Sequence, residues 1–216
     1  MGGNSDINEQ EVALFPIPNL VAFPGTVIPL HVFEPRYRQL VKDCLEDNRL
    51  LGVCHTRKTI RDAPKNQSAS EMLNTNQATY QPQEIFSAGP CRLIETTSDG
   101  RILAEIHVKH RLVIKSEKQT LPYKIVLCDE LQDTPDKDQQ ESKKLMQQIT
   151  TTLIPLVAKQ SDQVAERLED TDMTPTTFSF EIFQYLRFEP DVMQSILETQ
   201  STYDRLQMIW QIISQH

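Results

Sequence analysis

Five prolines interrupt an apolar stretch near the start of the chain, and they limit what this part can fold into. They stand within residues 14–40, at positions 16, 18, 24, 29 and 35. Because proline cannot donate a hydrogen bond to a sheet, a strand here must be short, lie at a sheet edge or contain a bulge. Pro24-Gly25 indicates a turn, and Pro35 suits the first turn of a helix, where a backbone N–H has no partner anyway. We therefore predict strands over residues 11–17 and 26–32, and a helix that begins near Glu34.

Composition and charge argue against several classes of protein. The 216 residues carry a formal net charge of −8, whereas affinity for nucleic acid rests largely on clustered Lys and Arg. The four cysteines, at positions 44, 54, 91 and 128, are widely spaced without a C-x-x-C pair, which favours reduced, buried thiols over a disulfide framework. The first residues are polar and acidic, and no apolar run approaches the ~18 residues of a membrane span. We expect a soluble, cytoplasmic protein with a disordered tail over residues 1–10.

The pattern of apolar residues predicts a β-rich domain over residues 11–131. A helix over residues 35–47 turns its apolar side towards a sheet and carries Arg36 and Arg38 on the other face. Asp99-Gly100 supplies the positive φ angles of a tight hairpin. Together the segments describe a partly closed barrel or folded sheet with one packed helix. Further strands are predicted over residues 50–56, 84–89, 91–98, 101–108, 111–115 and 123–131.

Residues 57–83 differ in character from the strands on either side. Lys, Asn, Gln, Ser, Thr and Ala dominate this stretch. Such a composition cannot bury enough apolar surface to fix a conformation by itself. We predict a mobile surface loop, and we favour an inert insertion over a functional lid.

The second half of the chain is predicted to be helical. Residues 132–138 are polar and contain Pro135, as expected of a linker. Over residues 139–216 the apolar period changes from two to about 3.6 residues, which predicts a subdomain of four or five helices. Pro155 should kink or end the first helix, and Thr174-Pro175 should begin a later one. Trp210 is expected in the core, and a short helical piece is marked by Val164, Ala165 and Leu168.

Several motifs resemble the N-terminal, substrate-binding domain family of Lon proteases. The opening of that family is similar to Phe23-Pro24-Gly25, Ile28-Pro29-Leu30 and Phe33-Glu34-Pro35-Arg36-Tyr37. Its helical end is similar to residues 194–198 followed by Arg205-Leu206. The resemblance covers roughly residues 12–214 and is closest to the bacterial form that stands alone, without ATPase and protease domains.

The resemblance implies both a fold and a role. The implied fold is α+β, with a PUA-like β-domain followed by a helical bundle. The implied role is that of a non-catalytic protein that binds unfolded or damaged polypeptide, or acts as an adaptor in protein quality control. A separate ATP-dependent protease is the partner to which clients could be presented, and a homo-oligomer is left open.

Motifs for catalysis and for cofactor binding are missing from the sequence. The six glycines do not have the spacing of a P-loop, and neither G-x-S-x-G nor H-E-x-x-H occurs. Cys54-His55 and the pair His107 and His110 are the only hints of metal ligands. Two residues three apart on a strand point to opposite faces, so these histidines should not converge. We expect no enzyme activity, no cofactor and no metal site.

The candidate peptide site lies at the start of the predicted helix. One interpretation is structural: Phe33 and Tyr37 pack the helix on the sheet, and Glu34 sits where the helix dipole favours an anion. This interpretation is favoured. The other is a peptide-binding groove lined by Phe33, Glu34, Arg36 and Tyr37, with Phe23 as a further member. We expect Arg92 and Arg111 to be solvated or salt-bridged.

Two other classes of function stay open at this point. PUA-like folds also host nucleic-acid or nucleotide recognition, although a fold alone is weak support and the acidic charge counts against it. An enzyme that uses His55, His107 or Glu34 in an unsuspected pocket ranks last.

Overall fold

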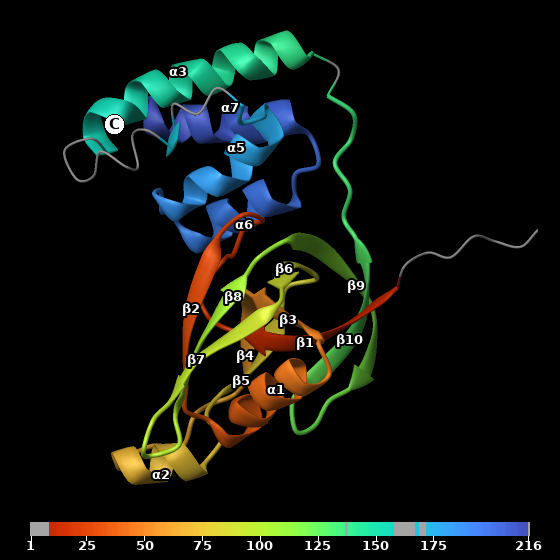
Figure 1. Ribbon diagram of the computed structural model, residues 1–216, viewed down its shortest axis with the longest axis vertical. Coiled ribbons are helices and arrows are strands. Elements are labelled where there is room, and N and C mark those ends of the chain that lie inside the picture. Colours follow the sequence, from red (N-terminus) through yellow and green to blue (C-terminus); the bar gives the residue numbers. More distant parts are fainter. Residues whose placement is uncertain (1–8, 137, 158–166, 169–171, 216) are drawn as a thin grey trace, which may run out of the picture. The chain divides into compact units, whose positions relative to one another are not determined.

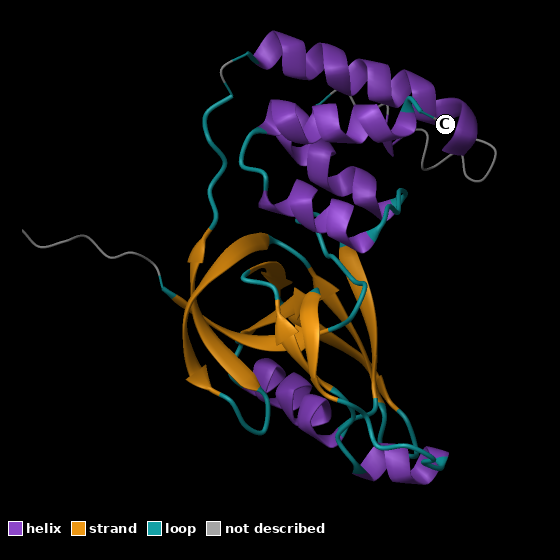
Figure 2. Ribbon diagram, turned by 180° about the vertical axis from the view of Figure 1, so that it is seen from behind, coloured by secondary structure: helices purple, strands orange, loops and turns teal. Residues whose placement is uncertain are grey.

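The computed structural model describes residues 9–136, 138–157, 167–168 and 172–215. The chain divides into two compact units, residues 1–131 and 132–216, and each is described by itself. The first is built mainly of strands and the second of helices (Figures 1 and 2). This confirms the predicted α+β class. Within the described residues, no helix has both the length and the apolarity needed to cross a bilayer.

The first unit is organised around a closed barrel of five strands. In order around the ring these are β1 (Gln10–Pro16), β10 (Lys124–Glu130), β9 (His110–Gln119), β6 (Ile85–Gly89) and β3 (Leu50–Cys54). Every neighbouring pair is antiparallel except β1 and β3, which run parallel. Closure leaves no unpaired barrel edge. The predicted barrel is therefore complete rather than partly closed.

A second sheet of three antiparallel strands lies in the same unit. Its order is β2 (Val27–Val32), β8 (Ile102–His107) and β7 (Cys91–Thr96). Pro29 lies in β2, at an edge, as expected for a residue without an N–H. Gly100 has a φ of +85° in the turn between β7 and β8, which is the predicted hairpin.

Helix α1 (Pro35–Glu46) closes one side of the core. It begins at the predicted proline and ends just before Asn48, whose φ of 53° is the left-handed conformation typical of a residue that follows a helix. Its buried face, with Tyr37 and Leu40, packs with β2, β3 and β8 residues in the larger apolar cluster. All four cysteines are free thiols, and burial raises the pKa of Cys44, Cys54 and Cys128 to about 12.

The prediction of a loop without regular structure over residues 57–83 is wrong. This segment contains most of β4 (Thr56–Arg61), then α2 (Ala69–Asn74) and β5 (Thr79–Pro82), and β4 pairs with β5. Ser68 and Glu71 form a capping box at the start of α2. The segment has little apolar surface of its own, but strand pairing, caps and hydrogen bonds from α1 hold it.

The second unit consists of helices of different lengths packed around a small core. The described helices are α3 (Gln139–Val157), α5 (Pro175–Glu181), the 3₁₀ helix η1 (Ile182–Gln184), α6 (Pro190–Glu198) and α7 (Thr202–Ile213). Pro155 lies inside α3, and Thr174 caps α5 as predicted. Leu168 is buried, whereas the predictions for Val164, Ala165 and residues 1–8 fall outside the described residues.

A buried arginine joins the linker to the helices of this unit. The Arg205 side chain is fully buried, and it donates to Asp133 Oδ1 at 2.8 Å and Oδ2 at 2.5 Å. It also donates to the Thr199 carbonyl oxygen at 2.8 Å and to Ser179 Oγ at 3.0 Å, and it lies over the Phe180 ring. Bidentate pairing of this kind satisfies a buried guanidinium. Arg205 therefore fixes residues 132–134 against α5 and α7.

We predict that Asp133→Ala destabilises the helical unit by about 3 kcal/mol, because it leaves a buried cation without its carboxylate. Denaturant unfolding followed by the fluorescence of Trp210, which is the single tryptophan and lies in α7, measures the change. Asp136→Ala is the control, since that carboxylate accepts a bond from Asp138 N–H in its own segment. Equal unfolding midpoints for the two variants would contradict the prediction.

Candidate functional site

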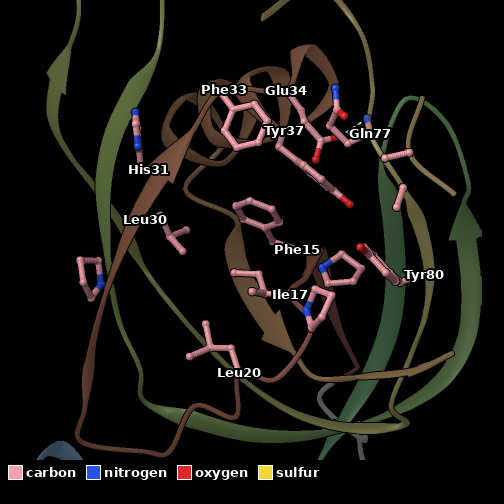
Figure 3. A pocket seen from close by; sticks show the side chains of 15 residues that line it. Phe15, Ile17, Leu20, Leu30, His31, Phe33, Glu34, Tyr37, Gln77 and Tyr80 are labelled. Carbon is pink, nitrogen blue, oxygen red and sulfur yellow. Dashed lines mark hydrogen bonds between the residues drawn. The ribbon is translucent and has the colours of Figure 1, made fainter. Parts of the chain in front are cut away.

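The first unit contains an apolar groove of about 410 Å³, which we call the main groove. Three segments line it: residues 15–20, residues 29–37 and parts of residues 63–80. Figure 3 shows Phe15, Ile17, Leu20 and Leu30 with side chains directed into it. The polar side chains of its lining, His31, Glu34, Gln77 and two tyrosines, are few. A concave, mostly apolar site with a few polar groups is the usual form of a ligand pocket.

Prolines form part of the wall of this groove. Pro16, Pro18 and Pro29 all line it. A proline presents an apolar ring and has no N–H that must find a partner. The same residues that keep these strands short therefore leave an apolar wall that can face a ligand without an unpaired donor.

Aromatic rings form the floor of the groove. The rings of Phe15 and Tyr37 lie with centroids 4.2 Å apart, and the Arg36 guanidinium lies 4.5 Å from the Tyr37 ring centroid. Burial raises the pKa of Tyr37 to about 12, so its hydroxyl stays protonated even in moderately alkaline solution. In Figure 3 the hydroxyl ends of Tyr37 and Tyr80 face one another.

An ion pair at the start of α1 holds one wall of the groove in place. Arg36 Nη2 lies 2.9 Å from Glu34 Oε2, and the two side chains are only 9% and 13% exposed. Arg36 donates to the Ala78 carbonyl oxygen at 2.5 Å and to Thr79 Oγ1 at 3.2 Å. Glu34 Oε2 accepts from the Gln77 N–H at 2.9 Å. The pair therefore binds residues 77–79 to the helix start.

A second arginine of α1 bonds to an earlier part of the same segment, in α2. Arg38 Nη2 donates to the Leu73 carbonyl oxygen at 2.7 Å, and Nη1 donates to the Gly100 carbonyl oxygen at 3.1 Å. These bonds connect α1 to α2 and to the turn between β7 and β8. Arg36 and Arg38 are not part of the buried face of α1, as predicted, but both donate to backbone carbonyls of neighbouring segments.

The family model of the ATP-dependent protease La (LON) substrate-binding domain matches residues 11–215 of the chain. The chain belongs to this family. The resemblance in the sequence motifs is thereby confirmed. The main groove and the ion pair of α1 are therefore features of a Lon substrate-binding domain.

Curated relatives agree with this assignment, and solved structures share the fold. Lon protease 1 of Herpetosiphon aurantiacus is 23% identical over 209 residues, which is 94% of this chain and 24% of that protein. The N-terminal domain of a Mycobacterium avium complex Lon protease has a TM-score of 0.67 at 13% identity, over 96% of this chain and 100% of that one. A Lon N-terminal domain protein from Xanthomonas campestris has a TM-score of 0.60 at 17% identity, over 94% and 98%. The chain spans 24% or less of the length of the curated relatives it matches.

The candidate residues chosen from the sequence fall in different places in this Lon domain. Phe33, Glu34 and Tyr37 line the main groove, while Arg36 lines a neighbouring cavity. Phe23 is 1% exposed, so the structure contradicts its contact with a peptide. Phe23 stands directly before the Pro24-Gly25 turn in the sequence, and this position did not indicate that its side chain would be buried.

Sequence reasoning missed other residues of the groove. Tyr80 belongs to the segment expected as a loop, and its polar neighbours hid its role. Phe15 and Leu20 lie on either side of the turn that follows β1, and alternation in that strand could have pointed to Phe15. Leu20 follows Asn19, whose φ of 61° marks the turn.

The histidines and the other arginines have separate partners. His55 is buried and its Nδ1 accepts from the Asn19 N–H at 3.1 Å, while His107 and His110 pair with Glu105 and Glu130. Among the described residues, no three His, Cys, Asp or Glu side chains gather to hold a metal ion.

The two arginines of the strands differ in exposure. Arg92 pairs with Glu105 as expected. Arg111 is only 4% exposed, so it is not solvated, and it donates to the Leu131 carbonyl oxygen.

We predict that Arg36→Ala loosens residues 77–79, because it removes two bonds to that segment and leaves Glu34 nearly buried without its cation. The free energy of unfolding should fall by about 2–3 kcal/mol. Hydrogen exchange of the amides in residues 62–79, read by mass spectrometry, should become at least about tenfold faster, as a loss of 1.4 kcal/mol or more of local stability requires.

Arg57→Ala is the matched control for this prediction. Arg57 pairs with Glu84 on the surface, with side chains 42% and 65% exposed. An exposed pair contributes about 1 kcal/mol or less. If exchange in residues 62–79 is as fast in Arg57→Ala as in Arg36→Ala, the ion pair does not hold the segment.

Proposed function

We propose that this domain binds polypeptide segments with exposed apolar side chains, as unfolded or damaged proteins display them, and that the main groove receives such a side chain. The supporting observation is the groove itself. Its floor is formed by Phe15, Leu30 and Tyr37, and its volume of about 410 Å³ suits a large apolar side chain together with some of its backbone.

The chemistry of the groove favours unfolded over folded clients. Folded proteins bury most of their large apolar side chains, whereas unfolded chains expose them to water. Transfer of such a side chain into the groove removes apolar surface from water on both partners. The gain is about 25 cal/mol for each Å² of apolar surface, and it does not depend on a particular sequence.

A sheet edge beside the groove can contribute backbone contacts. β2 is the outer strand of its sheet, and Pro29, Leu30 and His31 of this strand line the groove. An extended client lying in the groove therefore runs beside an edge strand, where strand addition gives affinity without sequence specificity. Pro29 cannot donate, so it limits how long such a ladder can become.

The family supports this role and suggests its context. The matched family is named for substrate binding, and the curated relatives are Lon proteases. We extend the proposal to an adaptor role, in which the domain holds a client for an ATP-dependent protease. In this role the chain itself is not catalytic.

The proposal predicts that the pure protein binds an unfolded model polypeptide but not its folded form. Fluorescence anisotropy can compare a labelled protein in its native, disulfide-bonded state with the same protein after reduction and alkylation. Tyr80→Ala and Leu20→Asn should each weaken binding of the unfolded form about tenfold, because they remove apolar contact or place an amide in the groove.

Leu93→Asn is the matched control. Leu93 is 44% exposed on β7 and does not line the main groove, so this variant should bind as the wild type does. Thermal melting of all variants separates loss of binding from loss of folding. Equal affinity for native and unfolded forms would overturn the proposal, and so would a loss confined to Leu93→Asn.

A further inference from the structure

A second cavity, of about 360 Å³, adjoins the main groove, and we call it the side groove. The two share Pro16, Tyr37 and Tyr80 in their linings. The two grooves are therefore neighbours on the first unit, with these two tyrosines between them. An extended segment that lies over Tyr80 can reach both grooves at once.

The side groove differs from the main groove in charge. Its charged lining residues are Arg36, Arg61 and Lys124, and its lining contains no carboxylate. This is unusual in a chain whose net charge is −8. Arg36 is paired with Glu34 and Lys124 with Glu117. Arg61 is exposed, and within the described part of the chain it has no ion-pair partner.

Apolar side chains stand beside this cation. Ile60 is 59% exposed and Leu121 is 79% exposed, and both line the side groove. Exposed apolar residues next to an unpaired guanidinium suit an occupant that carries both apolar groups and a carboxylate. Guanidinium is well matched to a carboxylate in geometry and in charge.

We propose that a client segment lies across Tyr37 and Tyr80, with an apolar side chain in the main groove and an Asp or Glu carboxylate at Arg61. This inference rests on the proposed function and adds a preference to it. The domain selects apolar segments that carry an acidic residue. Polypeptide is the occupant that fits, because three cations in an acidic protein are too few for nucleic acid.

Two peptides test this preference. Both have the same apolar sequence, and they differ at one position that is Glu in the first and Gln in the second. Fluorescence anisotropy at low salt should show the wild type binding the Glu peptide about two- to fivefold more tightly, the range of an exposed ion pair. At high salt the preference should disappear, since the pair is screened.

Variants of Arg61 assign the preference to this residue. Arg61→Gln should bind both peptides equally, and Arg61→Glu should bind the Gln peptide more tightly. Lys58→Gln is the matched control. Lys58 lies on the same strand, is exposed, and lines neither groove, so removal of its charge should leave the preference unchanged.

The outcomes separate this inference from the proposed function. If the wild type binds both peptides equally and Tyr80→Ala weakens both, the carboxylate preference is wrong and the apolar groove stands. If neither peptide binds, or if Tyr80→Ala weakens neither, the proposed function fails and the preference with it. A single-stranded RNA that binds the wild type but not Arg61→Glu would also overturn the inference, because the cation would then serve phosphate.

Discussion

The ion pair between Glu34 and Arg36 is the contact on which the candidate site depends. It stands at the first turn of α1, which packs on the barrel core through Tyr37 and Leu40. From this position it bonds to the backbone of Gln77 and Ala78, more than 40 residues away in sequence. One nearly buried pair thus joins the start of α1 to residues 77–79, which lead directly to Tyr80 in the groove lining.

The prolines connect the fold to the site. At Pro29 the missing N–H is compatible with an outer strand, and at Pro16 it coincides with the end of β1. In both places the ring then becomes part of the groove wall. A proline that the backbone geometry tolerates at these positions thereby also supplies apolar surface to the main groove. This explains why a stretch so rich in proline sits beside a cavity and not in the centre of a sheet.

Local signals in the sequence were sufficient for much of the fold. Pro35 marks the helix start, Asp99-Gly100 marks the hairpin, and the change of period after residue 138 marks the helical unit. The structure of residues 57–83 could not be predicted in this way. Its stabilising bonds come from Arg36 and Arg38, which are distant in sequence, and no local pattern connects these two residues with the segment. Tyr80 was missed for the same reason, and Phe23 was included because its burial depends on tertiary packing.

The barrel is closed by strands from the two ends of its unit. β1 pairs with β3 on one side and with β10 on the other, so residues 10–16 meet residues 124–130. During synthesis the ring cannot close until the ribosome has released nearly the whole unit. Until then, the edge of β1 that pairs with β10 has no partner strand. A nascent copy of this chain therefore exposes, for a time, apolar residues of β1 that the finished barrel buries.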